Sequence, residues 1–326
     1  MNSTLVSITP VARRLVEDYL AAKAGENFLI VVDTRTSPEI PDALMAQALA
    51  LGCDAAVMTI APRARSGENP PSHCAAAMKA AQVIVAAASS SLYHTQAKAE
   101  AQQAGARGVL NAPFTAEAWA NGAMTADFRE IRPVAERLRD LLKGGKTLRL
   151  TSLAGTDLTA SMEGRRPVGW LTALCREPGQ ISALPGGEVS LPPVEGTAEG
   201  RIVIEQVMSD LGQIETPLEL TVQDGNVTEV RGGAPAQAER LREILRTVRN
   251  AANIAEIGIG LNPKARLTDQ ITETKKRLGT AHIAVGDNAR EYGGSVECDV
   301  HLDGMILDVT IELDGKKIVD RGELLF

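Results

Sequence analysis

Apolar residues in the first half of the chain follow two kinds of spacing in alternation. Short continuous apolar runs, typical of buried parallel strands, cover residues 28–33, 55–60, 83–88 and 107–111. Apolar positions with helical spacing predict helices over residues 10–22, 37–51, 73–81, 92–104 and 128–142. Because strands and helices alternate, we predict a doubly wound parallel sheet for this α/β half of the chain.

The pattern changes after Lys143-Gly144-Gly145-Lys146, where we predict a boundary between two domains, 1–145 and 146–326. Beyond it, single apolar and polar residues alternate, as on half-buried antiparallel strands. This pattern covers residues 147–153, 219–222, 227–230, 305–313 and 317–319, and one helix is predicted over 236–251. The second half is therefore predicted to be an α+β domain with a mostly antiparallel sheet.

Length, charge and cysteine content narrow the class of protein. A chain of 326 residues suits two domains, and its net charge of -7 disfavours nucleic acid and anionic membranes as partners. No apolar run approaches the roughly 20 residues that cross a bilayer, and the N-terminus lacks the apolar core of a secretory signal. The four cysteines form no C-x-x-C pair, which is typical of a reducing compartment. We therefore expect a cytoplasmic globular protein that binds neither nucleic acid nor membrane.

The segment His301-Leu302-Asp303 is the sharpest chemical feature of the sequence. Alternate residues of a strand point to the same face, so the imidazole and the carboxylate would project together and suit one metal ion. A surface strand with two polar side chains explains the motif equally well when it is taken alone. The apolar alternation over 305–313 favours the metal site, because it puts the motif at the entry to a packed sheet.

Three further residues have metal-binding side chains in apolar or loop-like surroundings. His282 lies between glycines in a segment typical of a buried strand, where a structural core histidine is the ordinary alternative. Glu256 occupies an apolar segment, and Glu188 begins a strand; each would need a partner if buried, and a structural ion pair would supply one. Together with His301 and Asp303 they predict a site for one or two divalent ions, with zinc, cobalt, manganese or iron favoured over calcium.

His94 follows the third predicted strand, at the edge of a parallel sheet where ligands bind. We expect the preceding serines, 89–91, to cap the next helix, and His94 to be a candidate for the site of the neighbouring domain or subunit. His73 is expected on the surface. No glycine-rich nucleotide motif follows the first strand, so no nucleotide cofactor is predicted. The sequence also lacks G-x-S-x-G, the nucleophile motif of serine hydrolases, and H-E-x-x-H, the helix motif of the common zinc proteases.

Four segments of the second half resemble the aminopeptidase T family of metallopeptidases: LPGGEVSLPPVEGTAEG, AEIGIGLNPKA, GTAHIAVGDN and HLDGMILDVTIELDGKKIVDRGE. The resemblance implies that five side chains bind two metal ions, and by motif these are Glu188, Glu256, His282, His301 and Asp303. It also implies a homodimer or larger homo-oligomer, in which the N-terminal domain completes a partner's site. A family tyrosine has no counterpart in register, because Ala289 falls there and Tyr292 is only nearby.

A shorter branch of these proteins, which includes 2,5-dihydroxypyridine 5,6-dioxygenases, is similar through SSSLYHTQA, LAGTDLTASMEGRRP and HLD. These enzymes use one Fe(II) held by two histidines and one aspartate. In them a histidine stands at the position of Glu256, and the counterparts of Glu188 and His282 are lost. The resemblance therefore implies that this chain keeps the hydrolase-type ligand set.

Three hypotheses of function follow from these features. The first is a metal-dependent hydrolase of an amide or peptide-like bond in a small-molecule or short-peptide substrate, with a metal-activated water as nucleophile. Glu188 or Glu256 would bridge two ions, and Glu273 is a candidate for proton transfer, although a solvated face is its more ordinary interpretation. The second is an Fe(II)-dependent ring-cleaving dioxygenase of a hydroxypyridine-type aromatic. The third is a non-enzymatic binding protein.

Overall fold

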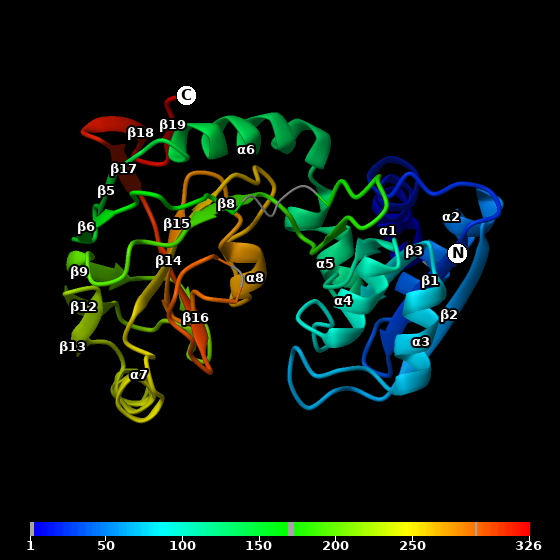
Figure 1. The fold of residues 1–326 in the computed structure, drawn as a ribbon, viewed down its shortest axis with the longest axis horizontal. Coiled ribbons are helices and arrows are strands. Elements are labelled where there is room, and N and C mark those ends of the chain that lie inside the picture. The colour runs from blue at the N-terminus through cyan, green and yellow to red at the C-terminus, as the bar shows by residue number, and fades with distance from the viewer. Residues whose placement is uncertain (1–2, 169–172, 291) are drawn as a thin grey trace. The chain divides into compact units, whose positions relative to one another are not determined.

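The computed structural model describes residues 3–168, 173–290 and 292–326, and Figure 1 shows the arrangement of the helices and strands. The chain forms two compact units. Unit 1 comprises Met1–Arg129 and Trp170–Gly186, and unit 2 comprises Glu130–Gly169 and Gly187–Phe326. These bounds differ from the expected boundary after residue 145, because a segment that ends at Gly186 returns to unit 1 and adds a strand to its sheet.

Unit 1 is built on a parallel sheet with the strand order β2-β1-β3-β4-β7. The strands are β1 (Asn27–Asp33), β2 (Asp54–Ile60), β3 (Val83–Ala87), β4 (Arg107–Val109) and β7 (Ile181–Ser182). All of β3, and all of β1 beyond its first residue, is buried, because helices cover the sheet. The predicted parallel sheet is confirmed, and burial on both faces explains the continuous apolar runs of β1 and β3. The burial expected for residues 55–60 is wrong, because β2 lies at the edge of the sheet and only its last residue is buried.

Helices cover the sheet of unit 1. They are α1 (Ser3–Arg13), the π-helical η1 (Arg14–Tyr19), α2 (Glu39–Ala50), α3 (Ser72–Ala80), α4 (Gln96–Gln103), α5 (Ala116–Ala120) and the 3-10 helix η2 (Gly122–Thr125). Apolar residues of α3 and α4 share one core with Leu29, Val31 and Ile84 of the sheet, while α2 packs against β1 and α1. Helix α1 begins at Ser3, earlier than the predicted start at residue 10, and it contains Pro10.

Helix α4 begins at Gln96, later than predicted, because Thr95 is its N-cap. The hydroxyl of Thr95 accepts a hydrogen bond from the N–H of Lys98 at 3.1 Å. The expected capping by the serine run is wrong. Ser89 instead donates its N–H and its hydroxyl to a carboxylate oxygen of Asp33, at 2.8 and 2.6 Å.

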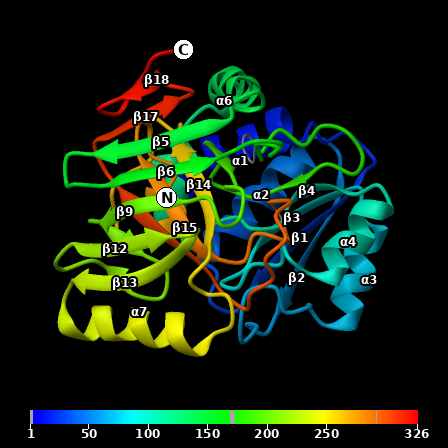
Figure 2. The same ribbon diagram turned by 60° about the vertical axis from the view of Figure 1, so that its left-hand side comes forward.

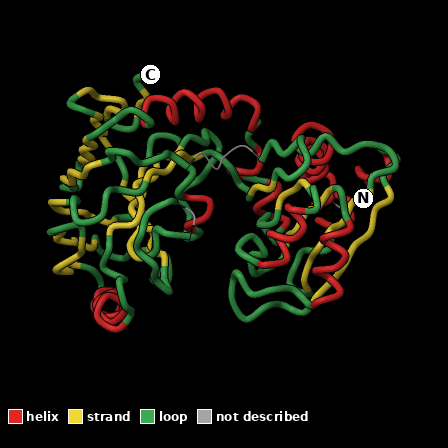
Figure 3. Tube along the Cα trace, in the orientation of Figure 1, coloured by secondary structure: helices red, strands yellow, loops and turns green. Residues whose placement is uncertain are grey.

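Unit 2 contains two antiparallel sheets, which confirms the predicted mostly antiparallel second half. The larger sheet has the order β13-β12-β9-β6-β5-β17-β18-β19. Its strands are β5 (Thr147–Ser152), β6 (Asp157–Ser161), β9 (Glu199–Ile204), β12 (Leu218–Gln223), β13 (Asn226–Gly232), β17 (Val309–Leu313), β18 (Lys316–Asp320) and β19 (Glu323–Leu324). Figure 3 shows that unit 2 is mainly strand and loop. Its helices are α6 (Phe128–Leu142), which begins at the division between the units, α7 (Pro235–Thr247) and α8 (Ile271–Thr274).

The smaller sheet of unit 2 has the order β11-β10-β16-β15-β14-β8. Its strands are β8 (Glu188–Leu191), β10 (Val207–Met208), β11 (Gly212–Gln213), β14 (Ile254–Gly260), β15 (Ala281–Gly286) and β16 (His301–Ile306). It lies next to the larger sheet through β16 and β9 (Figures 1 and 2).

The predicted single strand over 305–313 is wrong, because the chain turns between β16 and β17. Asp308 has a left-handed conformation with φ 47, which aspartate tolerates better than most residues. The turn sends β17 into the larger sheet, while β16 stays in the smaller one.

Across the described residues, no helix is both long and apolar enough to cross a membrane.

Candidate metal centre

One face of the smaller sheet of unit 2 carries the predicted metal-binding side chains. Directly paired residues of antiparallel strands share a face, and so do residues two apart along a strand. Glu256 on β14 pairs with Ala284 on β15, which pairs with Asp303 on β16. His282 and His301 lie two residues from this row on their own strands, and therefore on the same face.

Glycine makes room for the imidazole of His282 on this face. Gly258 pairs with His282, and a Cβ built on Gly258 would lie 2.0 Å from the Cε1 atom of the imidazole. The ring therefore lies across the backbone of β14, where any larger residue would displace it. Ile257 and Ile259 are buried on the opposite face, so the Ile-Gly alternation of β14 separates an apolar face from the face that carries the donors.

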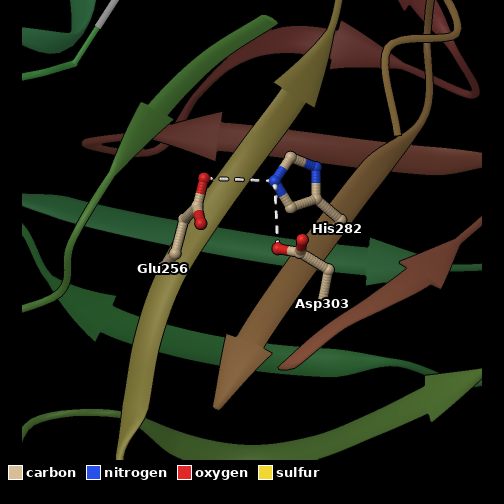
Figure 4. A group of neighbouring side chains, drawn as sticks. All are labelled: Glu256, His282 and Asp303. Atoms are coloured by element: carbon tan, nitrogen blue, oxygen red, sulfur yellow. Dashed lines mark hydrogen bonds and ion pairs between the residues drawn. The ribbon is translucent and has the colours of Figure 1, made fainter. Parts of the chain in front are cut away.

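Both imidazoles face the carboxylate of Glu256. The Nε2 atom of His282 lies 3.1 Å from Oε1 of Glu256, and the Nε2 atom of His301 lies 2.8 Å from Oε2. Oδ1 of Asp303 lies 3.8 Å from Nε2 of His282 and 3.6 Å from Nε2 of His301. Figure 4 shows Glu256, His282 and Asp303 pointing toward one another from neighbouring strands, with donor atoms within 4.8 Å of one another. Because donors at about 2.0–2.2 Å from one ion lie about 3 Å apart at right angles, this spacing suits a common ion.

Glu188 and two lysines extend the group. Oε2 of Glu188 lies 3.8 Å from Nε2 of His282, while its Oε1 accepts a hydrogen bond from the ammonium group of Lys276. The ammonium group of Lys275 lies 3.0 Å from Oδ2 of Asp303 and 4.0 Å from Oε1 of Glu188. Both lysines directly follow α8, which lies beside β16. Neither lysine is a candidate from the sequence alone, because exposed lysine pairs are common and two adjacent lysines are a weak signal.

Several buried polar atoms in this group have unmet hydrogen-bonding capacity. Glu256 and His282 are fully buried, and Asp303 is 7% exposed. In the described part of the chain, Oδ1 of Asp303, Oε2 of Glu188 and Nδ1 of His282 have no hydrogen-bond partner. A buried polar atom without a partner costs about 1–3 kcal/mol. Because the two carboxylate oxygens both lie near the same imidazole nitrogen, the donor set fits a divalent transition-metal ion.

The electrostatics of the group keep Glu256 and Asp303 ionised. Burial opposes ionisation of Glu256, but His282, His301 and Lys275 hold its pKa well below the usual range. Burial likewise opposes ionisation of Asp303, and Lys275 and the histidines lower its pKa. Burial lowers the pKa of His301, but the neighbouring carboxylates of Asp303 and Glu256 raise it well above the usual value. The carboxylates thus have the charge that metal ligands need.

A loop fixes the orientation of His301. Its Nδ1 donates a hydrogen bond to the carbonyl oxygen of Asp287 at 2.7 Å, which leaves Nε2 facing Glu256. The ring of Tyr292 stacks on the imidazole, with centroids 5.0 Å apart and planes 4° apart. Hydrogen bonds of this kind on the far ring nitrogen orient metal-ligating histidines in other proteins.

Glu195 holds both ends of that loop. It accepts hydrogen bonds from the side-chain amide of Asn288 at 3.0 Å and from the N–H of Ser295 at 2.8 Å, and it pairs with Arg165. These contacts fix the ends of the segment that carries Tyr292. Glu195 is not a candidate from the sequence alone, because its role depends on tertiary contacts between distant segments.

The structure brings Glu188, Glu256, His282, His301 and Asp303 together. Glu273 is buried and pairs with Arg266, whose Nε lies 3.1 Å from Oε1, so the solvated face expected for Glu273 is wrong. His94 belongs to unit 1, and its part in the site stays a prediction.

Comparisons with known proteins identify relatives of the whole chain. The family model described as NicX, 2,5-dihydroxypyridine 5,6-dioxygenase, matches residues 16–326. A solved 2,5-dihydroxypyridine dioxygenase from Pseudomonas putida KT2440 has a similar fold, with a TM-score of 0.83 and 20% identity over 98% of this chain and 97% of that chain. AmpT from Thermus thermophilus has a TM-score of 0.74 and 17% identity over 98% and 99% of the two chains. No curated protein sequence matches. The family model confirms the resemblance to the dihydroxypyridine dioxygenases, and AmpT confirms the resemblance to aminopeptidase T at the level of the fold.

Proposed function

The chain belongs to the 2,5-dihydroxypyridine 5,6-dioxygenase family, and on this premise we propose that it is a metal-dependent enzyme that opens the ring of a hydroxylated pyridine-type substrate. The observation that carries the proposal is the position of Asp303. One of its carboxylate oxygens lies within 3.8 Å of the Nε2 atoms of both His282 and His301. Two imidazoles and one carboxylate are the usual protein ligands of non-haem Fe(II) in oxygenases. In this chain His282 would supply the second imidazole, because Glu256 stands where the motif resemblance gives the related dioxygenases a histidine.

The residues of the chain prepare this site in distinct ways. Asp303 and Glu256 supply carboxylate oxygens that stay ionised because of the neighbouring cationic and imidazole groups. Asp287 orients the ring of His301 through its carbonyl oxygen, and Gly258 gives His282 the room to lie across β14. Bound Fe(II) would supply the redox chemistry through which O₂ reacts with an electron-rich aromatic ring.

Hydrolysis of an amide bond is the second candidate, and a specific observation favours it. The group contains Glu188 and Glu256 in addition to Asp303, and an oxygen of Glu188 lies 3.8 Å from Nε2 of His282. A carboxylate beside a metal-bound water is suited to take a proton from it. The fold that the chain shares with AmpT is compatible with this chemistry, although fold alone does not define a reaction.

One pair of assays separates the two candidates. Metal-free protein is loaded anaerobically with Fe(II), and O₂ uptake is measured with 2,5-dihydroxypyridine and related hydroxypyridines. The same protein loaded with zinc, cobalt or manganese is assayed on amides and dipeptides. We expect O₂ uptake coupled to loss of the aromatic absorbance, and only with Fe(II). Hydrolysis by the zinc or cobalt form without O₂ uptake would contradict ring cleavage and support the second candidate. The variant His73→Ala is the control, because His73 is an exposed histidine of unit 1.

A further inference from the structure

The geometry points to a single-ion centre in which the ammonium group of Lys275 takes the position of a second metal ion. This inference rests on the proposed metal site, and it assigns a role to a residue outside the ligand set. Its basis is the way in which two carboxylates, Asp303 and Glu188, are shared between the histidines and the lysines.

The two oxygens of Asp303 face different positive groups. Oδ1 lies 3.6 Å from Nε2 of His301 and 3.8 Å from Nε2 of His282, which is the side of the proposed ion. Oδ2 lies 3.0 Å from the ammonium group of Lys275. A carboxylate that bridges two metal ions has the same arrangement, with one oxygen toward each ion. Lys275 therefore stands where the second ion of such a pair would bind Asp303.

Glu188 repeats this arrangement from another strand. Its Oε2 lies 3.8 Å from Nε2 of His282, whereas its Oε1 lies 4.0 Å from the ammonium group of Lys275. The same Oε1 accepts a hydrogen bond from Lys276. Two carboxylates on different strands thus have one oxygen on the side of the imidazoles and the other on the side of Lys275. That repetition makes an incidental surface ion pair a poor explanation of the lysine.

The side chain of Lys275 is held in this position. It is 13% exposed, and its residue is the C-cap of α8, where its N–H bonds to the carbonyl oxygen of Ile271. Because α8 lies beside β16, the end of this short helix brings the side chain to Asp303, and the carboxylates of Asp303 and Glu188 hold the ammonium group there. Lys276 differs from Lys275 in its partners. It pairs with Glu188, whereas the carboxylate of Asp303 bonds to Lys275.

Charge explains why a second ion would be excluded. With both imidazoles neutral, as metal binding requires, the three carboxylates and two ammonium groups have a net charge of −1. One divalent ion brings the group to +1, and a second beside the ammonium group of Lys275 would bring it to +3. In two-metal sites the ions lie about 3.5–4 Å apart, so an ammonium group in the position of the second ion would lie about that far from the first. A second ion would have to displace the ammonium group or lie against it, and like charges at this range repel strongly.

The test is the number of ions bound per chain. Metal-free full-length protein is titrated with Mn²⁺ by calorimetry, and electron paramagnetic resonance distinguishes an isolated ion from a spin-coupled pair. We expect one isolated ion in the wild type and in Lys275→Arg. In Lys275→Ala we expect a second, coupled ion that binds at least about a hundredfold more tightly than any second ion in the wild type. Lys276→Ala is the matched control, a neighbouring buried lysine whose removal leaves the count at one.

Several results would overturn the inference: two coupled ions in the wild type, an unchanged count in Lys275→Ala, or a second ion in Lys276→Ala. If Lys275→Ala does not fold, Lys275→Gln decides, because it keeps most of the volume without the charge; a second ion supports the inference and a single ion contradicts it. Absence of any bound ion from the wild type would overturn both this inference and the proposed metal enzyme. A count of one in the wild type and two in Lys275→Ala would stand even if no hydroxypyridine were cleaved.

Discussion

Asp33 in unit 1 and Asp303 in unit 2 are both buried carboxylates, but the chain surrounds them differently. Asp33 ends β1 and accepts hydrogen bonds from the N–H and the hydroxyl of Ser89 and from the N–H of Arg35, at 2.8, 2.6 and 2.9 Å. Asp303 has one oxygen on Lys275, while within the described residues its other oxygen has no hydrogen-bond partner.

This difference separates a structural acid from a candidate ligand. The carboxyl ends of parallel strands are where ligands usually bind in doubly wound sheets, and Asp33 lies at such an end. Yet both of its oxygens are already bonded to the chain, so its burial is explained without a ligand. The unmet oxygen of Asp303 faces two imidazoles, and the proposed cation would satisfy it. For these two carboxylates, the presence or absence of hydrogen-bond partners is thus a better indicator of a ligand site than the position of the residue in the fold.

The largest expected effect is that of Glu256→Ala. Because Glu256 contacts the Nε2 atoms of both histidines, its loss should abolish metal-dependent turnover and lower metal affinity at least about a hundredfold, more than loss of an outer-shell partner usually does. Affinity is measured by competition with a chromophoric chelator, and folding by circular dichroism. Asp33→Asn is the control that should leave affinity unchanged. Wild-type affinity and activity in Glu256→Ala would remove Glu256 from the site.

A pair of glycine variants sharpens the comparison between the units. A Cβ on Gly258 would lie 2.0 Å from the imidazole of His282, and a Cβ on Gly108 would lie 2.0 Å from the backbone oxygen of Ile84. Gly258→Ala should displace the imidazole and lower metal affinity about ten- to a hundredfold. Gly108→Ala should leave metal affinity unchanged and destabilise the fold by about 1–3 kcal/mol, because backbone cannot move aside easily. The same loss of affinity in both variants would contradict a local effect on His282.

Asp33→Asn should destabilise the protein whether or not metal is present. Replacing an ionised acceptor weakens charge-assisted hydrogen bonds worth about 1.5–3 kcal/mol each, so we expect a loss of that order in urea unfolding. Metal at a hundred times its Kd should stabilise wild type and variant alike, by about 2.7 kcal/mol. A metal-induced stabilisation that disappears in Asp33→Asn would mean that Asp33 belongs to the metal site, and would break the contrast between the units.

The smallest expected effect concerns Glu195 and pH. Burial opposes its ionisation, but hydrogen bonds from Ser295 and Asn288 and the charge of Arg165 lower its pKa to about 2 from 4.5. A lowered pKa in the folded state means that ionised Glu195 stabilises the protein above pH 4.5 and that this contribution is lost as the pH falls toward 2. The difference in unfolding free energy between wild type and Glu195→Gln should therefore shrink as the pH is lowered through this window. A difference independent of pH would contradict the role of the ionised carboxylate.

The sequence made the parallel sheet and the donors of the site predictable for physical reasons. Buried parallel strands such as β3 leave continuous apolar runs. A carboxylate in the apolar segment around Glu256, and the alternation of His301 and Asp303, are unusual enough to indicate shared chemistry. The family resemblance then connected these residues across segments that are distant in the chain.

Other features depend on tertiary contacts that leave little trace in the sequence. The turn at Asp308 interrupts an apolar alternation that continues on both sides of it, so β16 and β17 were predicted as one strand. Strand β7 has two residues, too few for a periodic pattern. In the sequence, Lys275 and Lys276 are typical of an exposed pair of charged residues. That their side chains reach the carboxylates follows only from the position of α8 beside β16.

The location of a bound metal ion decides whether these side chains share one cation. Crystals of the protein loaded with Mn²⁺ or Fe²⁺ are measured on both sides of the metal absorption edge, so that anomalous scattering reveals each ion. We expect one peak at about 2.0–2.3 Å from Nε2 of His282, Nε2 of His301, an oxygen of Glu256 and an oxygen of Asp303, with the ammonium group of Lys275 still on the other oxygen of Asp303. A peak elsewhere, or imidazoles that face away from Asp303 in the loaded protein, would contradict it.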